Sequence, residues 1–500
     1  MNSFTKWILE SLVFSLLGTL ALGQGPAVGL WVDKKEPDPP PPQYKLLKIH
    51  PQAAPSPALM YRLDPESRFQ ESGNAVQNYY RAYSPEWASF RYRDQDYWKK
   101  EEEWLKLPID KLPPEADKRN ARYLWEIEKG TNRSYADWDM IPGIKRDGIM
   151  FLLPDIQGMR QFARDLTLRT RFELKEKDYP AAIKSMRTTI TMGRHVAKGV
   201  TLIQGLVGIA ITTIGFKQVE DGIQQPGFPN LYWALAALPS APIDLREAMD
   251  GEKFLMESIT PGLRDILYSK KPKAVGQPEL QAMVEKFREA MSLTGNNGRG
   301  RTDMENWMDK VGLSVTMAAS FPAAKEKLLK YGWEPKALDG LPPLQVVLMC
   351  EILIYDEAYD SILKWLNVPY WQAKTELEKT IQAGKLNEGS GVSPIPLGVL
   401  ARLLLPATSK VLEAKVRNQR HLAQLMVVEA IRMHAAQTGK LPQTLEDIKI
   451  APIPVNPVSG KPFSYKNEGS FAMLESEKIS DGDPKEYHRF RLELVTPAKK

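Results

Sequence analysis

The sequence has little cysteine and little histidine: one cysteine and five histidines among 500 residues. A single cysteine, Cys350, cannot form an intramolecular disulfide. It lies in the apolar stretch from Val346 to Ile354, which predicts a buried, inert thiol with no histidine close in sequence to activate it. The histidines are scattered and none forms a pair at the helical spacing of metal ligands. They are His50, His195, His421, His434 and His488.

The chain also lacks the short motifs of common catalytic sites. Neither the HExxH motif of zinc peptidases nor the GxSxG motif of serine hydrolases is present. The stretch Ser459-Gly460-Lys461 looks like the end of a phosphate-binding loop. Such a loop requires glycine where this chain has Val455, and serine or threonine where it has Pro462. We therefore interpret this stretch as a turn that begins a small sheet.

Pairs of neighbouring carboxylates are the remaining candidates for catalysis, because a glycosidase places two of them around the bond it cleaves. Asp137 and Asp139 flank Trp138, and Asp356 precedes Glu357. Among 61 acidic residues, some such pairs arise by chance. They support an alternative function rather than the preferred one.

Charge of one sign is not concentrated anywhere. The chain has 67 basic and 61 acidic residues, a net charge of +6, which does not predict nucleic-acid binding. Residues 61–150 form an aromatic-rich segment in which basic and aromatic residues alternate, as in some single-strand binding proteins. Acidic residues such as Glu101 and Glu103 are equally frequent there, so we predict that these aromatics pack onto the main body.

The first residues have the layout of a secretory signal peptide, assigned to residues 1–23. Lys6 lies in a short polar start, Leu12 to Leu22 is uncharged and mostly apolar, and small residues follow. We expect a periplasmic or secreted protein. An uncleaved membrane anchor is the alternative, although the run is short for a bilayer core of about 30 Å. Residues 24–60 are predicted to be a proline-rich linker.

Residues 151–409 predict a multi-helix body, so the fold class is mainly α. Apolar residues recur at helical spacing on both sides of a break at Lys177 to Pro180. This hairpin resembles one tetratricopeptide repeat, with Tyr179 and Ala182 at the aromatic and small positions. No second copy follows at about 34 residues. Further helices are expected at 244–258, 278–293, 304–330, 343–366 and 370–383.

One stretch, Val200 to Phe216, carries no charge and approaches the length of a membrane span. Its polar residues, including Gln204, favour a helix buried in the core, so no membrane span is expected in the mature chain. Gly205 and Gly208 would allow a neighbouring helix to approach closely.

Residues 410–500 combine a long helix with a small sheet. Apolar residues recur at helical spacing from about Ser409 to Thr438, and Gly439 ends the helix. After it the period becomes two, which predicts three antiparallel strands packed on the long helix. The alternating residues are Phe463 and Tyr465, then Phe471 and Met473, then Phe490, Leu492 and Leu494.

This C-terminal region resembles the C-terminal part of type II secretion pseudopilins. The matching features are the long helix, GKLPQTLEDI at 439–448, PVNPVSGKPFSY at 454–465 and an acidic loop at 481–483. Some pseudopilins hold calcium in that loop, so the resemblance makes Asp481 and Asp483 candidate calcium ligands. No other cofactor is expected. The chain has no prepilin cleavage site with a glutamate-bearing helix, so filament assembly is not implied.

The whole chain resembles uncharacterised exported proteins of planctomycete bacteria. That group has no established activity, so the resemblance implies location and architecture only. The stretches that carry it are PQAAPSPALMYRLDP at 51–65, GNAVQNYYRA at 73–82, DGIMFLLPDIQGMR at 147–160, PIDLREAMDGE at 242–252 and VVEAIRMHAAQTGKLP at 427–442.

The predicted function is that of a non-enzymatic helical scaffold or protein-interaction protein of the cell envelope, with an envelope or secreted protein as its partner. The alternative is an envelope hydrolase acting on glycans or peptides, suggested by export, the aromatic-rich segment and the carboxylate pairs. A polar pocket between the aromatic-rich segment and the helical body is the structural feature whose presence would most help to decide between them.

Overall fold

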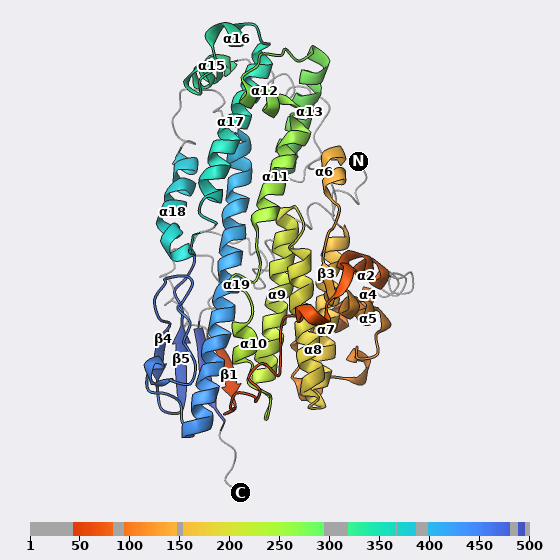
Figure 1. Cartoon of the computed structure of the whole chain (residues 1–500), viewed down its shortest axis with the longest axis vertical. Helices are drawn as coiled ribbons and strands as arrows, with labels where there is room; N and C mark the ends of the chain where they lie inside the picture. Colours follow the sequence, from red (N-terminus) through yellow and green to blue (C-terminus); the bar gives the residue numbers. More distant parts are fainter. Residues whose placement is uncertain are drawn as a thin grey trace, which may run out of the picture.

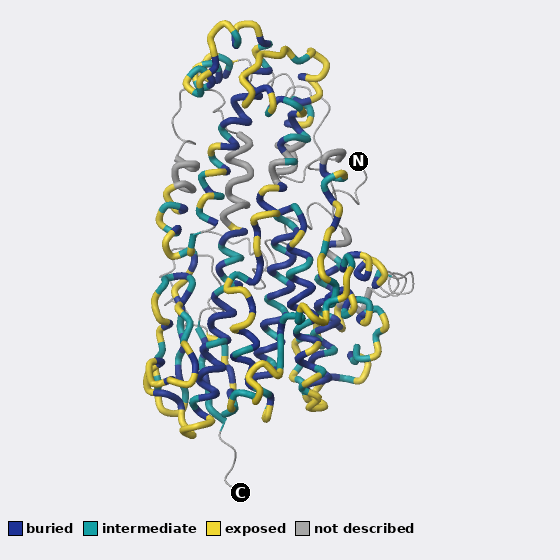
Figure 2. The backbone as a smooth tube through the Cα atoms, viewed as in Figure 1, coloured by how far each residue is buried: buried dark blue, intermediate teal, exposed yellow. Residues whose placement is uncertain are grey.

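The computed structural model describes residues 44–83, 95–147, 154–294, 319–366, 368–386, 399–480 and 489–495. The molecule is elongated and mainly α, as predicted, with its small sheet at one end of the long axis (Figure 1). In the described parts of the long helices, buried residues lie mainly toward the inside of the molecule (Figure 2).

The middle of the molecule is a bundle of three consecutive helices, α7 (Pro154–Lys175), α8 (Tyr179–Val196) and α9 (Leu202–Ile223). The predicted hairpin is the α7–α8 pair. Its tight turn places Lys177 in the left-handed region, at φ 60°, and Asp178 caps α8 by accepting a hydrogen bond from the Ala181 amide. Pro180 lies in the first turn of α8, where a missing donor costs no helical bond.

Helix α9 is buried along most of its length, as predicted from the uncharged stretch that ends at Phe216; its last turns carry Lys217, Glu220 and Asp221. Among the described residues it is the helix long and apolar enough to cross a membrane, judged by length and composition alone, and 61% of its most apolar window lies inside the fold. Gly208 permits its close approach to α8. A Cβ at Gly208 would lie 2.6 Å from the Gly193 carbonyl oxygen and 2.6 Å from the Ala197 Cβ.

A second core fills the end of the molecule opposite the sheet and contains Cys350. The predicted helices are all present there, except that residues 304–318 lie outside the described part. The helices are α11 (Arg246–Ile259), α12 (Leu263–Ser269), α13 (Gln277–Thr294), α15 (Phe321–Lys330), α16 (Pro335–Asp339), α17 (Pro343–Leu363) and α18 (Tyr370–Leu386).

The aromatic-rich segment packs on α7 and α8 through a third core (Figure 1). As expected for an inward face, Tyr79 is fully buried and Trp138 nearly so. Two short strands, β2 (Glu71–Asn74) and β3 (Arg133–Tyr135), pair in parallel. The helices of the segment are α2 (Ala75–Ala82), α4 (Gln95–Lys106), α5 (Arg122–Thr131) and α6 (Ile141–Asp147). Short elements elsewhere are α10 (Tyr232–Ala236) and 3-10 turns at Ser67–Phe69, Ile109–Lys111, Pro114–Ala116 and Leu445–Asp447.

The C-terminal sheet has the three predicted antiparallel strands, β4 (Ser464–Asn467), β5 (Phe471–Glu475) and β6 (Arg489–Leu494). A fourth strand was not predicted. Lys45–Ile49 forms β1, which pairs in parallel with β6 and gives the order β1-β6-β5-β4. The prediction of a linker over 24–60 is therefore wrong at this strand. Residues 24–43 lie outside the described part.

Helix α19 (Val399–Thr438) runs about 60 Å along the molecule at 1.5 Å per residue and begins ten residues earlier than predicted. Its C-terminal half carries buried charges that hold the N-terminal strand region. Arg432 has no exposed surface. It donates to the carbonyl oxygens of His50 (2.9 Å) and Phe228 (2.8 Å) and pairs with Glu429 at 2.8 Å.

Candidate functional site

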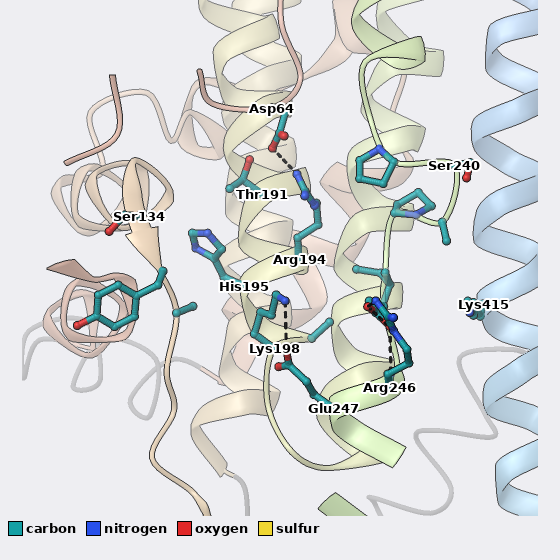
Figure 3. Close-up of a pocket in the computed structure, with 18 of the residues that line it drawn as sticks. Asp64, Ser134, Thr191, Arg194, His195, Lys198, Ser240, Arg246, Glu247 and Lys415 are labelled. Atoms are coloured by element: carbon teal, nitrogen blue, oxygen red, sulfur yellow. Dashed lines mark hydrogen bonds and ion pairs between the residues drawn. The ribbon is translucent and has the colours of Figure 1, made fainter. Parts of the chain in front are cut away.

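A cleft of about 810 Å³ opens where the aromatic-rich segment meets the helical body. Its walls are residues 134–136 at the end of β3, the last turn of α8, the loop 239–244, the first turn of α11 and one side chain from α19. The labelled residues extend from Ser134 at one end to Lys415 on α19 at the other (Figure 3). This is the position in which a functional pocket was expected.

Charged side chains in the cleft are arranged in pairs. Arg194 of α8 pairs with Asp64, and Lys198 lies 3.4 Å from Glu247 of α11. Arg246 donates through Nε to both carboxylate oxygens of Asp244, at 3.0 and 2.9 Å. These hydrogen bonds to Arg246 outweigh partial burial and lower the pKa of Asp244, so this carboxylate is ionised at neutral pH.

His195 occupies the centre of the cleft between Arg194 and Ser134 (Figure 3). The Tyr79 hydroxyl lies 2.6 Å from its Nδ1, which fixes the ring and leaves Nε2 for a ligand. Behind it, the Trp138 indole donates to the His195 carbonyl oxygen at 2.8 Å and stacks against Tyr79. Burial, reinforced by the charges of Arg194 and Lys198, lowers the pKa of His195 to about 4. The imidazole is therefore neutral at pH 7.

We expect His195 to make the protein less stable in acid. Between pH 6.5 and about 4 the unfolded chain binds a proton at this residue that the folded protein does not, so stability falls as the pH falls through this window. The depressed pKa corresponds to about 3 kcal/mol. In urea unfolding at pH 7, 6, 5 and 4, His195→Gln should lose less stability on acidification than the unaltered protein.

The matched control for this measurement is His434→Gln, at a half-buried histidine near the C-terminal end of α19. Burial also lowers the pKa of His421, which adds to the acid loss in all variants alike. The decisive quantity is thus the difference between His195→Gln and His434→Gln in the free energy of unfolding that each loses on acidification. An identical acid dependence in these two variants would contradict the assignment.

The residues considered from sequence as catalytic candidates are engaged elsewhere. Asp137 Oδ1 accepts from the Asp139 amide at 2.9 Å, at the edge of the fold. Asp356 accepts from Arg264 at 2.6 Å and also from Tyr268, far along α17 from the cleft. Cys350 is fully buried, and burial with the nearby Glu351 charge raises its pKa to about 12, as expected for an inert thiol.

Among the described residues, no three His, Cys, Asp or Glu side chains lie close enough together to hold a metal ion. The calcium candidates Asp481 and Asp483 fall outside the described residues. His421 is also structural. Its Nε2 lies 2.7 Å from Glu220, which in turn pairs with Lys45 of β1.

Sequence reasoning missed His195, Arg194, Asp64 and Lys415 as a group. Each is an ordinary residue in its own stretch, and they are brought together only where the loop that holds Asp64, the end of α8 and α19 line one cleft. The one useful signal was the clustering of aromatics before residue 150, since Tyr79 and Trp138 support the histidine from behind.

Comparison of the chain with protein-family models, with curated proteins and with solved structures finds no match. The protein is therefore described by its own structure. It is mainly helical and elongated, with a small mixed sheet, and its described residues form a charged cleft beside the aromatic-rich segment.

Proposed function

We propose that this is an exported, non-enzymatic interaction protein of the cell envelope, and that the cleft around His195 binds a segment of its partner protein. One observation carries the proposal: each of the three carboxylates among the described lining residues, Asp64, Asp244 and Glu247, is paired with a basic side chain of the same cleft. Paired charges on a concave surface suit recognition of a polar partner.

The same pairing gives little support to a glycosidase. That chemistry requires one carboxyl group with a raised pKa to protonate the leaving oxygen. Asp244 has a lowered pKa because Arg246 holds its ionised form, so it is unsuited to the role of the acid.

The hydrolase alternative rests on His195, a neutral imidazole whose Nε2 is directed away from Tyr79 and which could accept a proton from water. Purified protein assayed on envelope glycans and peptides would test it. Turnover that is abolished in His195→Gln, with unchanged circular dichroism, would replace the binding proposal by this alternative.

The binding proposal is tested by capturing partners from envelope extracts with the immobilised protein. Ser240 is exposed on the cleft wall, so Ser240→Trp should fill the cleft without disturbing the core. We expect at least one envelope protein to be captured by the unaltered protein and by Ser240→Ala, and to be lost with Ser240→Trp. Capture that survives the tryptophan, or no captured protein at all, contradicts the proposal.

A further inference from the structure

Lys415 is the exception to the paired charges of the cleft. Its side chain enters from α19, and its Nζ has a 3.4 Å contact with the Leu366 carbonyl oxygen. Among the described residues no carboxylate lies within 4.0 Å of this ammonium group, whereas Arg194, Lys198 and Arg246 each have one. The structure thus contains a half-buried lysine with one long hydrogen bond.

The surroundings of Lys415 make this arrangement costly. Burial lowers its pKa, Arg246 lowers it further, and only Asp244 acts in the opposite direction. Asp244 cannot complete a pair, because Arg246 engages both its oxygens through the guanidinium and one of them again through the backbone amide at 3.0 Å. A buried ammonium without an anionic partner is destabilised, and an anion supplied from outside would relieve that cost.

The charge balance specifies what is missing. Among the described residues, four basic side chains and three carboxylates line the cleft, and His195 is neutral, which leaves an excess of one positive charge. One carboxylate would neutralise it. A phosphate monoester carries a charge of about −1.5 to −2 at neutral pH and would leave an excess of negative charge.

We infer that the partner places the carboxylate of an aspartate or glutamate side chain on Lys415, within an extended segment lying along the cleft. This inference rests on the proposed function. Tyr135, Pro239 and Pro242 also line the cleft, and the Tyr135 ring is half exposed, so the walls offer apolar surface on which an extended chain can lie.

The inference is tested by fluorescence anisotropy with labelled hexaglutamate and hexaglutamine peptides on the full chain. We expect hexaglutamate to bind the unaltered protein, and to bind Lys415→Gln about 10- to 100-fold more weakly, the range for one charge-assisted hydrogen bond. Hexaglutamine should bind both proteins equally weakly. Lys440→Gln removes the same charge from an exposed position beyond α19 and should leave the affinity unchanged.

Equal binding of hexaglutamate to Lys415→Gln and Lys440→Gln overturns the inference, and so does the absence of binding to the unaltered protein. Displacement of the peptide by inorganic phosphate more readily than by acetate would indicate a phosphate site and also overturn it. Lys415→Met, which keeps the aliphatic stem, serves as the second variant if Lys415→Gln does not fold.

The partner capture separates this inference from the proposed function. If Ser240→Trp abolishes capture and Lys415→Gln does not, the cleft binds the partner but the carboxylate assignment is wrong. If capture survives both substitutions, the proposed function itself is wrong.

Discussion

Arg432→Met is expected to lower the free energy of unfolding by about 3 to 5 kcal/mol, the usual effect of removing one partner of a buried ion pair. Arg432 and Glu429 have no exposed surface, so the substitution leaves the Glu429 carboxylate and two carbonyl oxygens without their donor. Burial already raises the pKa of Glu429 against the attraction of Arg432, and without the arginine it should become protonated. Urea unfolding followed by circular dichroism measures the loss.

Two further variants make this prediction specific. Arg122→Met, at an exposed arginine of α5, should leave stability within about 0.5 kcal/mol of the unaltered protein. The double variant Glu429→Gln/Arg432→Met should be more stable than Arg432→Met, because no carboxylate is then left unpaired. A single variant as stable as Arg122→Met would show that the pair does not hold the fold together.

Arg432 also connects distant parts of the chain, since it binds the carbonyl of His50 just after β1. We therefore expect limited proteolysis of Arg432→Met to cut first near residues 44–60. The exposed backbone of a released strand is a better protease substrate than a packed one.

Gly208→Val is expected to lower the free energy of unfolding by about 3 kcal/mol, at the upper end of the usual cost of overpacking. Any Cβ at this position collides with the backbone of α8 at Gly193, and a backbone atom cannot turn aside as a side chain can. The resulting displacement of α8 should also move His195. Thermal unfolding followed by circular dichroism reports the loss.

The matched comparison is Gly208→Ala with Gly205→Ala in the same helix. A Cβ at Gly205 would meet the end of the Leu245 side chain at 2.6 Å, which can shift, while the contacts at Gly208 are two backbone atoms and the Cβ of Ala197, which cannot. Both substitutions gain about 1 kcal/mol in helix propensity. The difference between their free energies of unfolding therefore measures the cost of the collision at Gly208. If Gly208→Ala is as stable as Gly205→Ala, the two helices are not as close as described.

The helices and strands that were predicted correctly are those whose pattern of apolar and polar residues can be read within one short stretch of the chain. The uncharged stretch of α9 that ends at Phe216 had to be buried, and the alternation of Phe490 and Leu492 with polar residues required a sheet with one covered face. The covered face of β5 was predicted wrongly: Ala472 and Leu474 are fully buried and pair with Leu492 and Phe490, while Phe471 and Met473 are half-buried on the other face. Strand β1 was missed because Lys45–Ile49 follows a run of prolines, which predicted an extended linker. It becomes a strand only because β6, more than 400 residues later, offers an edge.

The cleft could not be predicted residue by residue for the same reason. The spacing of Asp64, His195 and Lys415 along the chain carries no relation to their positions in space. A motif can be read from sequence when one turn or one helix holds all of its side chains, and here six separate stretches of the described chain contribute.

The sequence by itself determined a mainly helical architecture, the buried α9, the α7–α8 hairpin and the three C-terminal strands, because helical and strand periods are local properties of the chain. Only the tertiary structure decided that β1 completes the sheet, that Arg432 is buried against His50, and that Lys415 faces a cleft without a carboxylate partner among the described residues. These features depend on which distant segments meet, and that is set by the packing of whole helices rather than by any one stretch.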